Sequence, residues 1–420
     1  MFQIPRGTRD FTPEEMQKRK YVEEKMRIAF QHFGYKEVQT PTFETIELFT
    51  AKSGETIIDE LYFFKDKGGR DLALRPELTA PVIRFYVEKL QMEPKPLKLF
   101  YFGNCFRYDR PQKGRYREFM QAGCELIGTD TPEAYAELIS LAYTILKNVG
   151  LKDLKLNIGN LSVLTSIFKG FNISKDQQIK LIPLIDKLMF DDIILFLKDS
   201  GISENDAQKF TEILQQSDSN VILNLIDKDE QSKNEMMKLI QILDLLKNNF
   251  DIKTSEIKMS IVRGLDYYKG VVFEIDAPGL GAEKQLCGGG AYELIPLFGG
   301  RETPTSGFAI GFDRTILALE VEKYKFPSQN LDFYVIPVDE KMSIKSLEIT
   351  RNLRKQGLSV DMDLLNRGIS KSLKYASSIN VDKIIIVGQK ELINESVTVR
   401  DMKTGKQELV KINNLYQKMH

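Results

Sequence analysis

Two strand-like segments joined by a short loop constrain the fold of this chain most. The segments LKLFYFGNCFRY and YREFMQAGCELIG lie within residues 97–128, and the loop DRPQKGR between them contains Pro111 and Gly114, which interrupt strands. From Arg117 onward two sets of residues alternate: the apolar Met120, Ala122, Cys124 and Leu126, and the mixed Phe119, Gln121, Gly123 and Glu125. An amide and a carboxylate around a glycine make a poor core surface. We therefore predict a sheet with one buried face and one face that serves as the floor of a site for a small polar ligand.

The loop between these strands concentrates positive charge in a chain that has no net charge. The segment FRYDRPQKGRYREF contains five basic residues but only two acidic ones, Asp109 and Glu118. The whole chain, by contrast, has equal numbers of basic and acidic residues, 59 Lys and Arg and 59 Asp and Glu. Arginines that repel one another are costly unless a polyanion neutralises them, and each charged hydrogen bond to phosphate is worth about 1.5–3 kcal/mol. We therefore expect a phosphate-bearing ligand. The sequence contains neither a Walker-type nor a G-x-G-x-x-G cradle, so the ligand is not held by those loops.

The position of Arg107 allows two interpretations. Arg107 shares a strand face with Tyr101, Gly103 and Cys105, so its side chain can point over a floor kept low by glycine. Alternatively, Arg107 and Glu125 form only a surface pair across the two strands, worth about 0.2–1 kcal/mol. The sequence leaves both interpretations open.

Composition excludes several other classes of protein. With 42% hydrophobic and 28% charged residues in 420, the chain is expected to be globular, with at least one large core and two or three domains. No apolar run approaches the roughly 20 residues that cross a bilayer, and the start MFQIPRGTRDF lacks the layout of a signal peptide. Cys105, Cys124 and Cys287 have no metal spacing and are expected to be reduced, packed cysteines of a cytoplasmic protein. His32 and His420 are too few for a histidine-based triad or zinc site.

Changes of pattern divide the chain into four segments. Residues 1–161 include the two strands, and residues 162–258 are rich in Ile, Leu, Lys and Asp at helical spacing, which predicts a helical insertion. Strand and glycine signals return over residues 259–326. Residues 327–420 alternate strand and helix patterns and end in a hairpin pattern around Gly405, which predicts a small α/β domain.

Six segments resemble motifs of one enzyme family. FRYDRPQKGRYREF is similar to motif 2 of the class II aminoacyl-tRNA synthetases, specifically of the histidyl-tRNA synthetase family. The others, in chain order, are RGTRDFTPEE (amino-terminal signature), YKEVQTP with the helix before it (motif 1, the dimer-forming element), LRPELTA (amino-acid-contacting segment), VRGLDYYKGVVFE (histidine-specific motif) and GFAIGFDRTILAL (motif 3). They follow the family's order over nearly the whole chain.

The resemblance implies an α/β protein whose α+β catalytic core has an antiparallel class II synthetase sheet flanked by helices. Residues 1–161, with motifs 1 and 2, and residues 259–326, with the histidine motif and motif 3, are expected to form that core. The insertion 162–258 either clamps the acceptor arm of tRNA or only caps and stabilises the core. Residues 327–420 are expected to be a mixed α/β anticodon-binding domain, and motif 1 implies a homodimer.

The implied activity is that of a cytoplasmic histidine–tRNA ligase with no membrane partner. Such an enzyme activates L-histidine with ATP to histidyl-adenylate, releases pyrophosphate, and transfers the histidyl group to the 3′ end of histidine tRNA. ATP, as a substrate, and Mg²⁺ are the expected cofactors. Fixed guanidinium groups suit this chemistry, because in phosphoryl transfer a protein supplies mostly positioning and charge stabilisation.

The resemblance assigns the phosphates of ATP to arginines. Arg107 would grip the α-phosphate, Arg115 would bind the terminal phosphates, and Arg314 would reach ATP from the other side. Arg263 would span the histidine carboxylate and the α-phosphate, a position that other class II enzymes commonly leave to a metal ion. Arg263 and Arg107 are therefore the expected catalytic residues. Glu118 is a loose candidate for a magnesium ligand beside ATP, and no other metal ligand is assigned.

The resemblance assigns a second group of residues to histidine: Glu77, Thr79, Gln121, Glu125, Arg263, Tyr267, Tyr268 and Tyr292. The first three would hold the α-amino group. Glu125 and Tyr268, with Tyr292 nearby, would bond the two imidazole nitrogens. Tyr267 and Tyr268 point to opposite faces if extended, so one of them is expected in the core, and the resemblance selects Tyr268 as the ligand contact. Gln112 lies where family members with this loop type read the extra 5′ guanosine of histidine tRNA.

The chain departs from the family pattern at CGGGAYEL. The family usually has Arg-Tyr-Asp after its glycine pair, whereas Ala291 and Glu293 flank Tyr292 here. This departure puts a supporting role of the two neighbours in doubt. CGGG can also be interpreted as a tight strand turn without ligand contact.

Three alternative functions stay open at the level of sequence. The first is a non-catalytic, synthetase-like regulatory subunit of histidine biosynthesis, which generally lacks the terminal domain and the motif arginines. The second is an RNA-binding adaptor that uses the fold without chemistry and needs no polar floor. The third is a class II synthetase for another amino acid, which RGLDYY disfavours. The presence of Arg107, Arg115, Arg263 and Arg314 together with a terminal domain favours the histidine–tRNA ligase.

Overall fold

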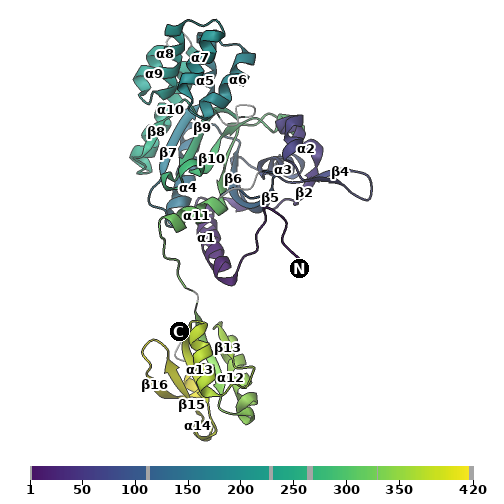
Figure 1. The fold of residues 1–420 in the computed structure, drawn as a ribbon, viewed down its shortest axis with the longest axis vertical. Helices are drawn as coiled ribbons and strands as arrows, with labels where there is room; N and C mark the ends of the chain where they lie inside the picture. Colours follow the sequence, from purple (N-terminus) through teal and green to yellow (C-terminus); the bar gives the residue numbers. More distant parts are fainter. Residues whose placement is uncertain (1, 110–113, 227–229, 263–267, 329, 416–420) are drawn as a thin grey trace. The chain divides into compact units, whose positions relative to one another are not determined.

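The two strand patterns around the basic loop are adjacent strands of an eight-stranded sheet. The computed structural model describes residues 2–109, 114–226, 230–262, 268–328 and 330–415, and the strand order of this sheet is β1-β5-β6-β11-β10-β9-β7-β8 (Figure 1). The strands are β1 Lys36–Glu37, β5 Leu97–Phe106, β6 Glu118–Ile127, β7 Lys155–Asn160, β8 Ser255–Ile257, β9 Tyr268–Asp276, β10 Gln285–Tyr292 and β11 Thr305–Gly311. From β5 to β7 every neighbouring pair is antiparallel, whereas β1 and β8 pair parallel at the two edges. The prediction of an antiparallel sheet is confirmed for all but these edges.

The two faces of this sheet differ as the alternation of side chains predicts. The Phe30 ring stacks on Phe100 and Phe308, with centroids 4.8 Å and 6.0 Å away. Both of these residues are cross-strand neighbours of Cys124, so the apolar face of the sheet lies under helices. The helices that contact the sheet on this core include α1 Pro13–His32, α4 Pro132–Asn148 and α11 Phe312–Val321. The opposite face, with its amide and carboxylate, is left for the site.

One buried carboxylate holds the amino-terminal segment against the start of α11. Asp313 accepts hydrogen bonds from Arg9 Nη2 at 2.8 Å and from Arg19 Nη1 at 2.5 Å. The same carboxylate accepts the backbone N–H of Met120, in β6, at 2.9 Å. The Arg9 guanidinium also lies 3.3 Å from the centroid of the Tyr116 ring, within the range of a cation–π contact. These contacts connect three distant parts of the sequence beside the strand that follows the basic loop.

Helices fill the chain between β7 and β8. They are α5 Leu161–Gly170, α6 Lys175–Asp186, α7 Phe190–Asp199, α8 Glu204–Gln215, α9 Ser219–Leu225 and α10 Glu230–Asn249. The first of them begins where Asn160 Oδ1 accepts the backbone N–H groups of Ser162 and Val163. The helices gather at the β7–β8 end of the sheet, and α10 contacts α4, α5 and β7 (Figure 1). Within the described ranges no helix is long and apolar enough to span a membrane.

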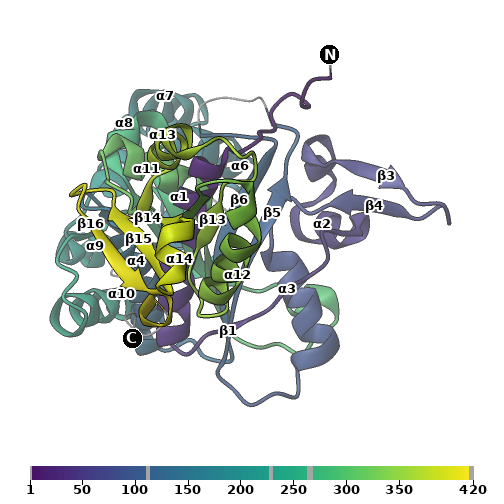
Figure 2. The same cartoon turned by 90° about the horizontal axis from the view of Figure 1, so that it is seen from below.

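A small antiparallel sheet, in the order β2-β4-β3, lies beside β5 on the side away from β6 (Figure 2). The elements of this region are β2 Phe43–Thr45, α2 Ile46–Ser53, η1 Glu55–Glu60, β3 Phe63–Lys65, β4 Asp71–Leu74, α3 Thr79–Phe85 and η2 Tyr86–Leu90. Its own core consists of Leu48, Phe49, Leu61, Ala73 and Ala80. The backbone N–H of Phe106 donates to the carbonyl of Arg75 at 2.9 Å, which joins the turn after β4 to the end of β5. The segment LRPELTA is thereby brought to the edge of the large sheet.

Residues 326–420 form a separate compact unit, distinct from the unit 1–325. Its sheet has the order β13-β12-β14-β15-β16, in which β12 is parallel to β13 and β14 and the remaining pairs are antiparallel. Its elements are β12 Leu331–Pro337, η5 Glu340–Met342, α12 Ser343–Arg354, β13 Val360–Met362, α13 Ile369–Ser378, β14 Val381–Val387, α14 Gln389–Ile393, β15 Ser396–Asp401, β16 Gln407–Lys411 and α15 Ile412–Leu415. The predicted alternation of strand and helix is confirmed. The predicted hairpin is β15–β16, and Gly405 at φ 72° provides its left-handed turn.

Candidate active site

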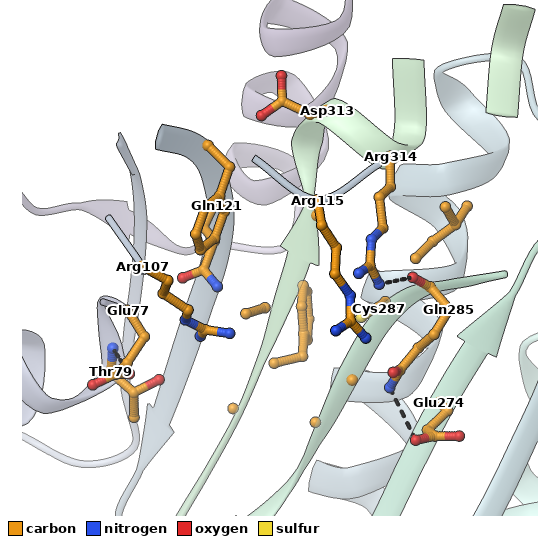
Figure 3. A pocket seen from close by; sticks show the side chains of 18 of the residues that line it. Glu77, Thr79, Arg107, Arg115, Gln121, Glu274, Gln285, Cys287, Asp313 and Arg314 are labelled. Atoms are coloured by element: carbon orange, nitrogen blue, oxygen red, sulfur yellow. Dashed lines mark hydrogen bonds between the residues drawn. The ribbon is translucent and has the colours of Figure 1, made fainter. Parts of the chain in front are cut away.

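A cavity of about 500 Å³ opens over the polar face of the large sheet. The residues predicted from the sequence that line it are Glu77, Thr79, Arg107, Arg115, Gln121, Tyr268, Tyr292 and Arg314. Figure 3 shows Glu77, Thr79, Arg107 and Gln121 on one side of the cavity and Arg115 and Arg314 on the other. Arg263, Tyr267 and Gln112, also predicted from the sequence, lie outside the described residues, whereas Glu118 and Glu125 are described but do not line this cavity.

The floor of the cavity is built around the carboxyl group of Glu125. Only 1% of this residue is exposed, and its Oε1 accepts a hydrogen bond from the Tyr101 hydroxyl at 2.8 Å. Its Oε2 accepts a hydrogen bond from the Tyr292 hydroxyl. Burial raises the pKa of Glu125 to about 8, although the two phenol donors oppose this shift. The carboxyl group therefore holds its proton at pH 7.

The burial of Glu125 decides between the two interpretations of Arg107. A surface pair between Arg107 and Glu125 is wrong, because Glu125 is buried and bonded to two tyrosines. The backbone N–H of Arg107 donates instead to the carbonyl of Arg117 at 3.0 Å, so Arg117 is its cross-strand neighbour. The side chain of Arg107 lines the cavity.

Two glycines make room for the buried carboxyl group. Gly307 is the cross-strand neighbour of Glu125, and a Cβ at this position would overlap the carboxyl oxygen. Gly123 is the cross-strand neighbour of Tyr101, and a Cβ there would lie 2.7 Å from the Tyr101 hydroxyl. The Tyr101 ring can therefore lie over its neighbouring strand and reach Glu125. Sequence reasoning assigned no ligand role to Tyr101, although the alternation had placed it on the same face as Arg107.

A further phenol, that of Tyr268, lies beside Tyr292. Tyr268 and Tyr292 are cross-strand neighbours on β9 and β10, with ring centroids 6.2 Å apart and planes at 72°. Both line the cavity. The carboxyl group of Glu125 and these phenols thus offer hydrogen-bond donors and acceptors at one end of the cavity, where they suit a small ring with polar atoms.

The strand β10 excludes the interpretation of CGGG as a turn. Residues 287–290 pair with β9 on one side and β11 on the other, and Gly288 and Gly289 line the cavity. The side chain of Glu293 is exposed and forms an ion pair with Lys269, which gives this departure from the family pattern a surface role. Cys105, Cys124 and Cys287 are buried and free, as the sequence predicts.

The turn between β4 and α3 presents a second carboxylate. Glu77 Oε2 accepts the backbone N–H of Thr79 at 2.7 Å, and Oε1 accepts that of Ala80 at 3.1 Å. Lys52 Nζ lies 3.2 Å from Oε2. Burial pushes the pKa of Glu77 up, but the charge of Lys52 and the two N–H donors outweigh it, so the pKa lies below its usual value. Glu77 is therefore ionised at neutral pH, whereas Glu125 is not.

Arg107 and Gln121 lie on the same side of the cavity as Glu77 and Thr79 (Figure 3). Arg107 Nε donates to the Pro76 carbonyl at 2.9 Å, and its guanidinium lies 5.3 Å from the centroid of the Phe119 ring. These contacts fix the Nε side of the guanidinium, and its terminal nitrogens point into the cavity (Figure 3). Gln121 Oε1 accepts a hydrogen bond from Cys105 Sγ at 3.4 Å, which orients the amide.

Arg115 and Arg314 meet on the other side of the cavity. Arg314 Nε donates to the Gly114 carbonyl at 3.2 Å, and Nη1 donates to the Gln285 carbonyl at 3.1 Å. One oxygen of Glu283, at the end of η3 (Pro278–Glu283), lies 2.7 Å from Arg314 Nη2 and 3.2 Å from Arg115 Nε. Two guanidinium groups held this close attract an anion, and Glu283 takes that place here. No pattern in the sequence marks Glu283, because it lies in an irregular segment.

The structure places Glu118 away from these arginines. Glu118 Oε1 accepts a hydrogen bond from Asn104 Nδ2 at 2.8 Å, and both residues line a second cavity together with Arg19 and Arg27. Glu118 therefore does not line the cavity in which ATP was expected. Across the described ranges, no three Cys, His, Asp or Glu side chains come together as they do in a metal site.

Comparisons with known proteins identify the relatives of this chain. The family model described as histidyl-tRNA synthetase matches residues 7–315, and the model described as anticodon binding domain matches residues 332–420. A curated relative, the histidine–tRNA ligase of Methanocaldococcus jannaschii, is 45% identical over 416 residues, which are 99% of each chain.

Solved structures with the same fold include enzymes of this family. Apo histidyl-tRNA synthetase of S. aureus is 31% identical with a TM-score of 0.76, covering 99% of each chain. A protein of Bacillus halodurans described as an ATP phosphoribosyltransferase regulatory subunit/histidyl-tRNA synthetase is 25% identical with a TM-score of 0.79, covering 92% of this chain and 98% of its own. Because one family model matches residues 7–315 and a curated ligase matches the chain nearly end to end, the chain belongs to the histidyl-tRNA synthetase family and is an aminoacyl-tRNA ligase.

Proposed function

We propose that this chain activates L-histidine with ATP to histidyl-adenylate and then transfers the histidyl group to the 3′ end of histidine tRNA. One observation carries the site assignment: segments far apart in the sequence place a carboxyl-and-phenol floor and three arginines in a single cavity (Figure 3). The family relationship supplies the reaction, and the cavity supplies a place for each reacting group.

The amino-acid end of the cavity matches histidine in charge and in hydrogen bonding. The ionised Glu77 receives the α-ammonium group, with Thr79 and Gln121 beside it. The imidazole ring lies between Glu125 and Tyr268. A side chain without two ring nitrogens would not form both of these hydrogen bonds, and sites that recognise a substrate in this way reject analogues by about 10⁴–10⁵.

The arginines act on the phosphates. A carboxylate oxygen of histidine attacks the α-phosphorus, a new P–O bond forms, and the bond to the departing pyrophosphate breaks. Arg107 stabilises the charge on the α-phosphate, while Arg115 and Arg314 hold the terminal phosphates. Arg263, assigned by the family resemblance, spans the histidine carboxylate and the α-phosphate. Guanidinium groups held in place cost no reorganisation during the step, and their charge is independent of pH in the working range.

We propose that Mg²⁺ arrives with ATP. The described residues offer no cage of three acidic groups, although Glu274 and Asp109 are among the residues that line the cavity. This fits an ion that keeps most of its water and is held mainly by phosphate oxygens. Bound in this way, Mg²⁺ would neutralise charge on the terminal phosphates.

The remaining assignments concern tRNA and assembly. Residues 327–420 would bind the anticodon, Gln112 would read the extra 5′ guanosine, and the helices of residues 162–258 would contact the acceptor arm or cap the core. The motif 1 resemblance supports a homodimer. A tRNA-charging enzyme works where translation takes place, which supports a cytoplasmic location.

Exchange of radiolabelled pyrophosphate into ATP, measured with each of the twenty amino acids, tests this function. We expect exchange with histidine alone. Arg107→Lys keeps the charge but loses the planar fork, and it should lower exchange by about 10²–10³, the cost of losing one well-placed donor. The matched control is Arg70→Lys, because the Arg70 side chain is 77% exposed and pairs with Asp66. Arg263→Ala should abolish exchange while leaving the fold and the dimer intact.

Three other results would contradict the proposal. Binding of tRNA without exchange would indicate an RNA-binding adaptor. Absence of both exchange and tRNA charging, with a stable complex to another enzyme, would indicate a regulatory subunit. Exchange with a different amino acid would indicate another specificity.

A further inference from the structure

Lys52 is a nearly buried cation in the wall of the cavity. It lies in the last turn of α2, which ends at Gly54, and only 8% of its side chain is exposed. Its Nζ is 3.2 Å from Glu77 Oε2, and both residues line the cavity. Removing a lysine from water is costly unless an anion compensates for the lost hydration, so this position calls for a reason beyond packing.

Glu77 is the anion that this lysine meets. The titratable groups that act on Glu77 or feel its charge are Lys52 from α2, Tyr101 and Cys105 from β5, and Glu125 from β6. Glu77 lines the cavity, Glu125 is buried beneath it, and their repulsion means that ionising one opposes ionising the other. Lys52 distinguishes the two carboxyl groups, because its charge lies beside Glu77, whereas the hydrogen-bond partners of Glu125 are the hydroxyl groups of Tyr101 and Tyr292.

The hydrogen bonds of Glu77 leave one oxygen better placed for a ligand. Oε2 is shared between Lys52 Nζ at 3.2 Å and the Thr79 N–H at 2.7 Å, whereas Oε1 accepts the Ala80 N–H at 3.1 Å. A substrate ammonium group is therefore expected at Oε1, on the far side of the carboxylate from the Lys52 charge.

We propose that Lys52 is a positioning residue of the amino-acid site, which keeps Glu77 ionised and fixed so that the site selects ligands with an α-ammonium group. The proposal rests on the proposed function, because histidine is the ligand that would carry this group. Lys52 does not need to touch the substrate. A merely structural role, in which the ion pair only ties α2 to the turn before α3, makes different predictions.

The test compares histidine with 3-(imidazol-4-yl)propionate, which has the same ring and carboxylate but no amino group. Their dissociation constants are measured by calorimetry from pH 6 to 8.5 for the wild-type chain and for Lys52→Met, Lys52→Gln and Lys52→Arg. Lys65→Met is the matched control, because its side chain is 67% exposed and pairs with Asp71.

In Lys52→Met the partly buried Glu77 loses its cation, so it takes up a proton as the pH falls. The affinity for histidine should then drop, relative to wild type, by about tenfold for each pH unit below the new pKa. The affinity for the analogue should change by less than about twofold, because the analogue has no ammonium group. Lys52→Arg should retain the wild-type pH profile, and Lys65→Met should match wild type throughout.

Either of two results with the variants would overturn the proposal. The first is a Lys52→Met or Lys52→Gln protein that still prefers histidine over the analogue as wild type does at every pH. The second is an equal loss of both ligands, which identifies a structural role. Binding of the analogue shows that each variant is folded, and Lys52→Gln replaces Lys52→Met if the latter does not fold. A wild-type chain that binds no histidine would contradict the proposed function itself and this inference with it.

Discussion

Glu125 provides a quantitative test of the electrostatics of the site. The substitution Glu125→Gln keeps the shape of the side chain but removes its titration. In the folded chain, burial raises the pKa of Glu125 from 4.5 to about 8. The unfolded chain ionises this group near its ordinary value, so the folded state holds a proton that the unfolded state releases.

The direction of the effect follows from this difference in bound protons. Below pH 4.5 both states are protonated and Glu125 costs nothing, whereas between 4.5 and about 8 the wild type loses stability as the pH rises. The whole interval corresponds to about 5 kcal/mol at about 1.4 kcal/mol per pH unit. Between pH 6 and 7.5 the free energy of unfolding of Glu125→Gln should therefore rise by about 2 kcal/mol relative to wild type.

Urea unfolding followed by circular dichroism at pH 6, 6.75 and 7.5 measures this difference for the transition of the larger unit. Other titrating groups are common to both proteins and cancel. Glu23→Gln is the control, because the pKa of Glu23 is shifted in the opposite direction. Desolvation raises this pKa, but the hydrogen bonds and charges of Lys20 and Arg27 outweigh it and lower the pKa below its usual value. Both of its states are ionised over this range, so its difference from wild type should be flat. A flat line for Glu125→Gln, or a relative loss of stability as the pH rises, would refute the assignment of a protonated, buried carboxyl group.

Three further changes test the rest of the molecule. Gly307→Ala places a Cβ against the carboxyl group of Glu125, so it should lower the free energy of unfolding by about 1–3 kcal/mol. In exchange kinetics it should raise the KM for histidine more than the KM for ATP. Equal KM values in variant and wild type would contradict this packing. Glu283→Gln removes the carboxylate that pairs with Arg314, so the KM for ATP and the inhibition constant of pyrophosphate should both fall, while the KM for histidine stays constant. A higher KM for ATP would show instead that Glu283 holds the arginines in the orientation that binds phosphate. Deletion of residues 326–420, which form their own compact unit, should leave histidine-dependent exchange intact and abolish charging of tRNA, measured by aminoacylation; loss of exchange would show that the two units depend on each other.

Local patterns were sufficient to predict the strands around the basic loop and their two faces. The period of two in β6 separates Cys124 from Glu125. The structure places Cys124 beside Phe100, which stacks on Phe30, and it places Glu125 beneath the cavity, bonded to Tyr101. This worked because the face on which a strand residue lies depends on its parity within the strand, which can be read from the sequence. The resemblance to a family then connected Arg107, Arg115 and Arg314, which no local pattern relates.

The sequence by itself determined which elements form, which face of each is apolar, and which residue types could bind phosphate and imidazole. Only the tertiary structure decided which side chains meet: Tyr101 reaches Glu125 across Gly123, Lys52 of α2 approaches Glu77 in the turn before α3, and Glu283 at the end of η3 pairs with Arg314. The physical reason is range. Periodicity follows from interactions between near neighbours in the chain, whereas the charge state of a buried carboxyl group depends on groups that come close only after distant segments pack together.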